Sequence, residues 1–324
     1  MVSPPRSEQR PLDPGSLADP VGGVVAAHHD GRDLALRTSG TTTGATRVVR
    51  STRSWWASFP GYSELSGVGR GARVWLPGPP ASTMNLFAAV HARVHGACVV
   101  DRPERATHAC VTPAVLARRG GALGPGTRVV VAGDALPRAA YDAATDRGLD
   151  MVHYYGAAEL SFVAAGAHAG DLHPFPGVEV EVRAGTIWAR SPYLARGVAD
   201  PNGWATAGDL GRLHGDRLVV TGRPDTVTTA GATVPLAAVE SALADRARGP
   251  FAVVGVPHPV IGAVLAAAVT DPGDRRRLRD HARHVLPPSH RPRLWRVLHD
   301  LPLTPAGKVD RDRLADLLRR TDDG

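Results

Sequence analysis

The chain is poor in lysine. Of its 38 basic residues, 37 are arginine and Lys308 is the single exception. A coding bias toward arginine would explain the 37, and chance the one lysine. Alternatively, position 308 requires a compact ammonium group on a flexible stem, which the planar guanidinium of arginine does not replace. The residues around Lys308 are therefore compared below with the rest of the sequence.

Cysteines and long apolar runs are also scarce. Cys98 and Cys110 are too few for a disulfide framework and lack the spacing of a metal site. Both lie in apolar stretches, so we predict two buried free thiols. No run of eighteen apolar residues is present, so we expect no membrane span. The polar residues 1–20 lack the apolar core of a signal peptide, and we expect a cytoplasmic protein.

The balance of charge raises the question of nucleic acid. The net charge is +7 and the pI is about 10.2, but the arginines are scattered along the chain. The densest cluster, at 274–280, has acidic ends and is more typical of a solvated helix face. Aromatic residues make up only 5%, which leaves little for base stacking. We expect no nucleic-acid partner, and the charge is compatible with an anionic small molecule.

The order of the apolar segments predicts an α/β fold. Strand-like segments alternate with helix-like ones, at 72–76, 83–94, 98–100, 107–112, 114–119, 127–132, 137–147 and 149–155. Alternation of this kind predicts a mostly parallel sheet flanked by helices, with ligands at the carboxyl ends of its strands. Short strands between residues 176 and 221 predict a small antiparallel region.

The remaining residues predict a second, smaller domain. After residue 224 the helix and strand patterns restart and describe a compact α+β module. We expect a large N-terminal domain at 1–223 and a C-terminal domain at 224–324. The first part, 1–30, is rich in proline and arginine near its start, and we expect it to be poorly ordered.

A loop rich in serine, threonine and glycine spans residues 38–47. It contains Thr38, Ser39, Gly40, Thr41, Thr42, Thr43 and Gly44, and Arg47 follows. Backbone N–H groups freed by glycine, together with several hydroxyls, suit a phosphate chain. No Gly-Lys-Ser/Thr sequence closes the loop, so it is not a Walker loop. Alone, the pattern is at least as typical of a flexible surface turn.

Further segments follow that loop in a fixed order. They are Gly133, Asp134 and Ala135; Tyr155, Gly156, Ala157, Ala158 and Glu159; Asp209; Arg223 and Asp225; Gly231; and Lys308. Each by itself could be a turn, a helix cap or a solvated charge. In this order they resemble the adenylate-forming superfamily of acyl-CoA synthetases, carrier-loading adenylation domains and luciferases. The resemblance covers roughly residues 36–316 and is closest to short actinobacterial acid–CoA ligases of the o-succinylbenzoate–CoA ligase kind.

The resemblance implies an ATP site in the large domain. The 38–47 loop would hold the β- and γ-phosphates, and Glu159 would hold the Mg²⁺ bound to them. Tyr155 would stack on adenine, beside Gly156–Ala158 and the Gly133–Ala135 strand end. Asp209 and Arg223 would bind the ribose hydroxyls.

It also implies roles in the C-terminal domain, which is mobile in this family. Asp225 would be the hinge, and Lys308 would bridge the substrate carboxylate and the α-phosphate. Gly231 would border the pantetheine of CoA, although a plain turn glycine is the alternative. The acid is left open: Phe87, His153 and Phe162 are candidates for its pocket, and ordinary core residues are the alternative.

Four departures from the family pattern affect these assignments. Three threonines, 41–43, stand where two hydroxyl residues are usual, which shifts the register of the loop. Thr46 and Arg47 replace the usual Pro-Lys, and Ala158 replaces a threonine before Glu159. Members of the family also carry a longer segment before the phosphate loop. We therefore expect a homodimer, or a partner protein, to cover the surface which that segment would cover.

The resemblance implies a ligase that forms an acyl-adenylate from a carboxylic acid and ATP, then passes the acyl group to CoA. Two alternatives stay open for the acceptor, the phosphopantetheine of a carrier protein and an amine. A non-catalytic member of the family is a further alternative, against which the joint presence of Lys308, Glu159, Asp209 and Arg223 argues.

Overall fold

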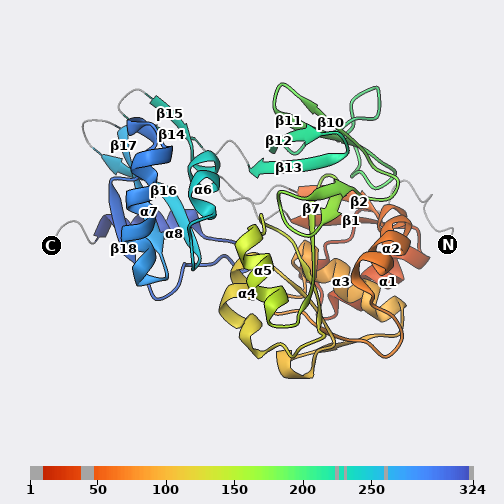
Figure 1. Cartoon of the computed structure of the whole chain (residues 1–324). Helices are drawn as coiled ribbons and strands as arrows, with labels where there is room; N and C mark the ends of the chain where they lie inside the picture. Colours follow the sequence, from red (N-terminus) through yellow and green to blue (C-terminus); the bar gives the residue numbers. More distant parts are fainter. Residues whose placement is uncertain (1–9, 38–46, 223–225, 230–231, 259–261, 321–324) are drawn as a thin grey trace.

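The computed structural model describes residues 10–37, 47–222, 226–229, 232–258 and 262–320 (Figure 1). Several residues singled out from the sequence lie outside these ranges. They are Thr38, Ser39, Gly40, Thr41, Thr42, Thr43 and Gly44 of the phosphate loop, together with Arg223, Asp225 and Gly231. Their roles stay predictions.

One large mixed sheet organises the first part of the chain. Its strand order is β10-β11-β12-β13-β9-β8-β7-β6-β5-β3-β4. The parallel strands are β3 (Arg73–Trp75), β4 (Cys98–Val100), β5 (His108–Val111), β6 (Arg128–Val131) and β7 (Asp150–Ala157). This part of the sheet confirms the predicted alternation of strands and helices.

The antiparallel strands continue the same sheet. They are β8 (Ser161–Gly166), β9 (Leu172–Pro174), β10 (Glu179–Arg183), β11 (Thr186–Arg190), β12 (Leu210–His214) and β13 (Arg217–Gly222). They confirm the small antiparallel region that we predicted, and β8 pairs directly with β7 and joins this region to the parallel strands. The reason is the tight turn at 158–160, which returns the chain along the edge of the last parallel strand.

Helices cover both faces of the parallel strands (Figure 1). They are α1 (Pro20–His29), α2 (Thr52–Ser66), α3 (Thr83–Val94), α4 (Pro113–Arg119) and α5 (Arg138–Asp146), with 3-10 turns at Pro14–Ser16, Pro103–Arg105 and Gly120–Ala122. On β6, Val130 packs into the cluster formed with α1–α3, whereas Val129 and Val131 pack with α4 and α5. Because side chains alternate along a strand, both faces of the sheet are buried.

The N-terminal segment is more ordered than we predicted. We expected residues 1–30 to be poorly ordered, but α1 lies within them and buries Val24 and Ala27. The Asp19 carboxylate accepts a hydrogen bond of 2.9 Å from the Gly22 N–H and caps this helix, and Pro20 begins it. β1 (Asp33–Arg37) then pairs with β2 (Arg47–Ser51) in a separate two-stranded sheet.

The C-terminal elements pack around sheets of their own. They are β14 (Thr226–Thr229), β15 (Ala232–Pro235), α6 (Leu236–Ala244), β16 (Phe251–His258), β17 (Gly262–Val269), α7 (Pro272–Val285), the 3-10 turn Pro288–His290, β18 (Leu294–Val297) and α8 (Arg311–Arg320). Within the described ranges, each hydrophobic cluster lies wholly before residue 223 or wholly after 225. This separation supports the proposed domain boundary at residue 223.

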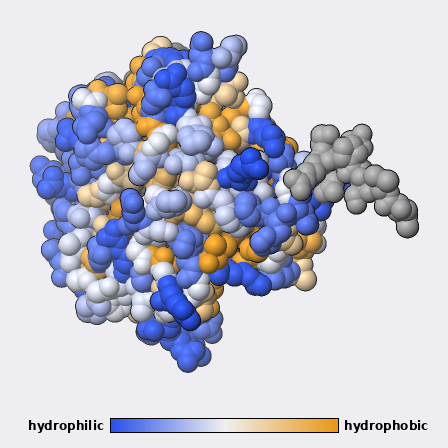
Figure 2. All heavy atoms as spheres, turned by 90° about the vertical axis from the view of Figure 1, so that its right-hand side faces the viewer, coloured by the Kyte–Doolittle hydropathy of each residue, from blue (hydrophilic) through white to orange (hydrophobic). Residues whose placement is uncertain are grey.

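Cys98 corrects the prediction of two buried thiols. Cys110 is buried in the core, where desolvation raises the pKa of its thiol to about 12. Cys98 is exposed, because it lies on β4, the strand at one edge of the large sheet. On the face shown in Figure 2, hydrophobic residues form small patches separated by hydrophilic ones. The expected second copy or partner protein stays a prediction.

Aromatic rings fill the core between the large sheet and α1–α3. Phe162 is 3% exposed and lies 4.7–4.9 Å, between ring centroids, from Tyr154, Phe175 and Phe87. Dense packing of this kind leaves no room for relaxation around a deleted ring.

We therefore predict that Phe162→Ala lowers the free energy of unfolding by about 3–5 kcal/mol, because it removes a buried ring and leaves a cavity. Urea unfolding followed by circular dichroism measures this change. Val99→Ala is the control, since Val99 is 51% exposed, and it is expected to change stability by less than about 0.5 kcal/mol. Equal effects of the two substitutions would contradict the assignment of Phe162 to the core.

Candidate active site

The candidate site lies at the carboxyl ends of β5, β6 and β7. Because these strands are parallel, the residues that follow them meet at one edge of the sheet. Gly133 follows β6 with φ +86°, a conformation that favours glycine. A Cβ placed on Gly133 would lie 3.4 Å from Thr112 Cγ2 and 3.7 Å from Lys308 Cε. The structure therefore brings the single lysine of the chain to this edge.

A tight turn of the C-terminal domain carries Lys308. Leu303 and Val309 form an antiparallel bridge, and the Thr304 N–H donates a 2.7 Å hydrogen bond to the Lys308 carbonyl. The Gly307 N–H donates to the Thr304 carbonyl at 2.9 Å. Residues 303–309 thus form a small closed unit that presents Lys308 at its end.

Asp134 lies in the same region and contributes negative charge. Desolvation by the surrounding protein raises the pKa of its carboxyl, while the Ala135 N–H, Arg311 and Lys308 oppose this rise. The Asp134 residue is exposed, so solvent weakens the effect. The Asp134 carboxylate and the Lys308 ammonium supply opposite charges on either side of the boundary between the domains.

Tyr155 and Asp209 meet although 54 residues separate them in the sequence. The Tyr155 hydroxyl donates a 2.8 Å hydrogen bond to Asp209 Oδ2, and Asp209 is 8% exposed. Between Tyr155 and Gly156 the pairing of β7 with β8 shifts, and a Cβ on Gly156 would lie 2.1 Å from the Ser161 carbonyl oxygen. Only glycine fits this close approach, which sets the direction of the Tyr155 ring.

Glu159 lies in the turn between β7 and β8, and the sequence analysis missed the residue that supports it. Arg50 on β2 is 1% exposed; it donates hydrogen bonds to the carbonyls of Ala158, at 2.6 Å, and Tyr193. Burial lowers the pKa of Arg50 to about 10, and the negative charge of Glu159 opposes this shift. The sequence signal for this role is weak: Arg50 follows two valines, Val48 and Val49, in a strand-like segment.

Arg47 pairs with Asp13 of the N-terminal segment. Its guanidinium donates a 2.8 Å hydrogen bond to Asp13, and the side chain is 46% exposed. The pair ties the start of β2 to the N-terminal segment. The predicted contact of Arg47 with a phosphate stays a prediction.

The three residues suggested for the acid pocket lie in the interior. Phe87 and Phe162 belong to the aromatic core, and His153 is 2% exposed on β7. The His153 Nδ1–H donates a 2.9 Å hydrogen bond to the Val131 carbonyl. Desolvation lowers the pKa of His153 to about 4, opposed by that hydrogen bond. These contacts are typical of core residues. That the three residues line the pocket for the acid stays a prediction.

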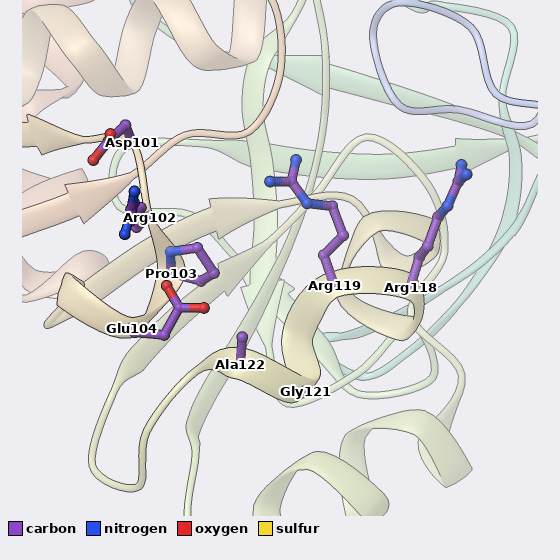
Figure 3. Close-up of a pocket in the computed structure, with 8 residues that line it drawn as sticks. All are labelled: Asp101, Arg102, Pro103, Glu104, Arg118, Arg119, Gly121 and Ala122. Atoms are coloured by element: carbon purple, nitrogen blue, oxygen red, sulfur yellow. The ribbon is translucent and has the colours of Figure 1, made fainter.

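Two hollows share Arg118 and Arg119, and one of them adjoins the Lys308 turn. One, of about 350 Å³, is lined by both domains, through Pro77, Gly78, Met84, Asn85, Val111, Thr112, Val115, Arg118, Arg119 and 303–307. The other, of about 570 Å³, is an open depression that Arg118 and Arg119 border at the end of α4, facing Asp101–Glu104 (Figure 3). In Figure 3 both arginines extend to the same side, away from Gly121 and Ala122.

Metal binding by protein ligands alone finds no support in the described ranges. No group of three or more His, Cys, Asp and Glu side chains there is arranged to hold an ion. A single carboxylate such as Glu159 suits Mg²⁺ that arrives with phosphates, since Mg²⁺ usually takes one or two carboxylates plus substrate oxygens. The described helices also include none long and apolar enough to cross a membrane.

Comparisons with known proteins agree with this geometry. Residues 238–308 match the family described as AMP-binding enzyme C-terminal domain. A protein of Mycobacterium tuberculosis named "Probable 2-succinylbenzoate--CoA ligase" is 35% identical over 59% of this chain and 53% of its own length. The chain is thus similar to AMP-binding enzymes and to CoA ligases. It spans about half the length of the curated relatives that it matches first.

Solved adenylate-forming enzymes share the fold. Escherichia coli MenE with bound OSB-AMS superposes with a TM-score of 0.76 at 22% identity, over 90% of this chain and 70% of that one. The amide bond synthetase McbA of Marinactinospora thermotolerans has a TM-score of 0.68 at 27% identity, over 88% and 69%. The fold of these solved enzymes is thus present here.

We predict that His153 makes folding dependent on pH. Its pKa is near 4 in the folded chain and 6.5 as an ordinary histidine, so the unfolded chain binds more protons between these values. The contribution of His153 to the free energy of unfolding is then fully present above pH 6.5. It decreases as the pH falls toward 4, by up to about 1.4 kcal/mol per pH unit.

His153→Asn keeps a donor near Val131 and removes the titration, so the slope of unfolding free energy against pH should decrease by about that amount. Urea unfolding at several pH values between 4 and 7 measures it. The same substitution at the exposed His173 controls for loss of an imidazole. An unchanged slope in His153→Asn would contradict the prediction.

Proposed function

We propose that the chain activates a carboxylic acid with ATP, forming an acyl-adenylate and pyrophosphate, and then transfers the acyl group to the thiol of CoA. The observation that carries the proposal is the position of Lys308 beside Gly133, at the carboxyl edge of the sheet. The names of the relatives support the same chemistry, since they include a 2-succinylbenzoate–CoA ligase and an ATP-bound MatB.

In this proposal the sheet edge binds the nucleotide. Tyr155 contributes a ring for adenine, next to the strand ends at Gly133–Ala135 and Gly156–Ala158. Asp209, oriented by the Tyr155 hydroxyl, accepts hydrogen bonds from the ribose. Glu159 holds Mg²⁺, which when bound neutralises phosphate charge. Arg50 keeps the backbone of the 158–159 turn in place.

Lys308 meets the main difficulty of the reaction. A carboxylate must approach the α-phosphorus while pyrophosphate leaves, so negative charges repel throughout. An ammonium placed where the two groups meet lowers this barrier by stabilising the shared charge, and the protein needs no covalent step of its own. A lysine suits the task because its charge is compact and its stem can extend from the turn.

The thiol of CoA is the acceptor that we favour, and an amine is the second candidate. The solved neighbour McbA is named an amide bond synthetase and is 27% identical to this chain, which favours an amine over a carrier protein. The phosphopantetheine of a carrier protein is the third candidate. The identity of the acid is left to experiment.

The proposed function predicts ATP–pyrophosphate exchange that depends on one class of carboxylic acid. We expect exchange with one member of a panel of aliphatic, aromatic and amino acids, and a decrease of roughly 10²–10³ in Lys308→Ala. Lys308→Arg tests whether any cation suffices, and Arg276→Ala, at a side chain 88% exposed, is the control. Folded protein that exchanges with no acid, or full exchange in Lys308→Ala, would overturn the proposal.

A second prediction concerns the ribose contact. Asp209→Asn replaces an acceptor oxygen by an amide donor, so the KM for ATP should rise about tenfold, the cost of one hydrogen bond to a charged group. Exchange kinetics at varied ATP measure this. Asp216→Asn, at a carboxylate 81% exposed, should leave the KM unchanged. An equal KM in Asp209→Asn and the wild type would remove Asp209 from the nucleotide site.

A further inference from the structure

The turn that carries Lys308 rests on a residue of the other domain. The Thr112 hydroxyl donates a 2.7 Å hydrogen bond to the carbonyl of Gly307, the residue before Lys308. These two residues are 195 positions apart in the sequence. Thr112 is 2% exposed and Gly307 is half-buried, so the surrounding protein partly shields this bond from water.

The fit at this contact is close. Gly307 has φ +78°, and a Cβ on it would lie 3.1 Å from both Thr112 Oγ1 and Val115 Cγ2. A side chain at this position would therefore push the turn away from the first turn of α4. The backbone of Gly307 packs directly against Thr112 and Val115, and we call this contact the seat of the Lys308 turn. The seat fixes the direction in which Lys308 leaves the turn.

Thr112 is itself fixed by the fold. It follows β5 directly and is the N-cap of α4, where its hydroxyl oxygen accepts a 3.3 Å hydrogen bond from the Val115 N–H. A hydroxyl has one proton to donate, and here the acceptor is the Gly307 carbonyl. The same side chain thus begins the helix and holds the lysine turn.

A second polar contact between the domains is weaker. Arg118 and Asp300 form an ion pair of 3.3 Å, with side chains 50% and 36% exposed. Exposed ion pairs contribute little, because solvent screens them and ordering two long side chains costs entropy. The buried hydrogen bond from Thr112 is therefore the contact that decides how the turn is seated.

We propose that Thr112 is a positioning residue for Lys308. The proposal rests on the proposed function for its catalytic consequence, since a seated turn places the ammonium at the carboxyl edge of β6 for formation of the acyl-adenylate. Loss of the Thr112 hydroxyl should release the turn without altering Tyr155 or Asp209. The rate of adenylate formation should then fall while ATP binding stays the same.

One experiment tests the seat without any substrate. Because Lys308 is the only lysine, this side chain and the N-terminus are the only aliphatic amines that an amine-reactive acylating reagent can modify, and peptide mass spectrometry separates them from each other and from Cys98. We expect Thr112→Val to increase the labelling rate of Lys308 by about threefold to tenfold, the range expected for loss of one buried hydrogen bond. Thr112→Ser, which keeps the hydroxyl, should label like the wild type.

Thr127→Val is the matched control. Thr127 is 4% exposed, and its hydroxyl donates a 2.7 Å hydrogen bond to the Gly124 carbonyl within the large domain. This substitution removes the same kind of carbonyl-bound hydroxyl from a similar environment, so the general effect of such a deletion would appear in it too. The α4 cap is lost only in Thr112→Val, and circular dichroism of that variant follows its effect. In Thr127→Val we expect no change in Lys308 labelling. The proposal would be overturned if Lys308 were labelled at the same rate in Thr112→Val as in the wild type. It would also be overturned if Thr112→Val and Thr127→Val gave equal labelling rates.

The second experiment measures the catalytic consequence. In ATP–pyrophosphate exchange, Thr112→Val should lower kcat by about tenfold with an unchanged KM for ATP, and Thr112→Ser should restore kcat. An unchanged kcat, or a rise in KM with no change in kcat, would overturn the positioning role while leaving the proposed function intact. Absence of exchange in the wild type would overturn the proposed function, and the labelling rates would still decide whether Thr112 seats the turn.

Discussion

The structure depends on parallel strands that are buried on both faces and end at one edge of a sheet. β5, β6 and β7 need helices on either side, because each carries apolar side chains in alternate directions. Side chains that must stay accessible to a ligand can then lie at the carboxyl ends of these strands. Thr112, Gly133 and Tyr155 lie there for this reason, although they come from three separate strands. The site is a consequence of burying the sheet.

Positive charge is used in two different ways around this edge. Arg50 is buried, and its guanidinium donates hydrogen bonds to two backbone carbonyls. These bonds replace the hydrogen bonds to water that burial removes. The planar fork of Arg50 suits a fixed position. Lys308 comes from another domain on a small turn, and a single ammonium on a long stem suits a charge that must be delivered to the site. This contrast gives a physical reason for one lysine among so many arginines.

A specific contact joins the Lys308 turn to the large domain. The Lys308 turn closes on itself through Thr304 and meets the large domain through the carbonyl of Gly307. A closed turn with one buried hydrogen bond can be released without unfolding either domain, since each has its own hydrophobic clusters. The arrangement is therefore compatible with a family whose small domain moves between two half-reactions.

Local elements could be predicted from the sequence because their signals are local. The helix predicted at 83–94 is α3 with the same bounds, and the strand predicted at 98–100 is β4. Hydrophobic periodicity within a dozen residues determined them. The ordered motifs also singled out Tyr155, Asp209 and Lys308, and their roles in a nucleotide site stay predictions.

Tertiary structure alone decided what surrounds these elements. Cys98 is exposed because β4 is an edge strand, and an edge is defined by what does not pair with it. The order of residues 10–30 depends on packing against α2 and α3, which lie later in the chain. The hydrogen bond between Thr112 and Gly307 joins residues that share no periodic pattern. The sequence by itself determined the elements and the motif residues, and only the tertiary structure decided these contacts, because they form between segments that folding brings together.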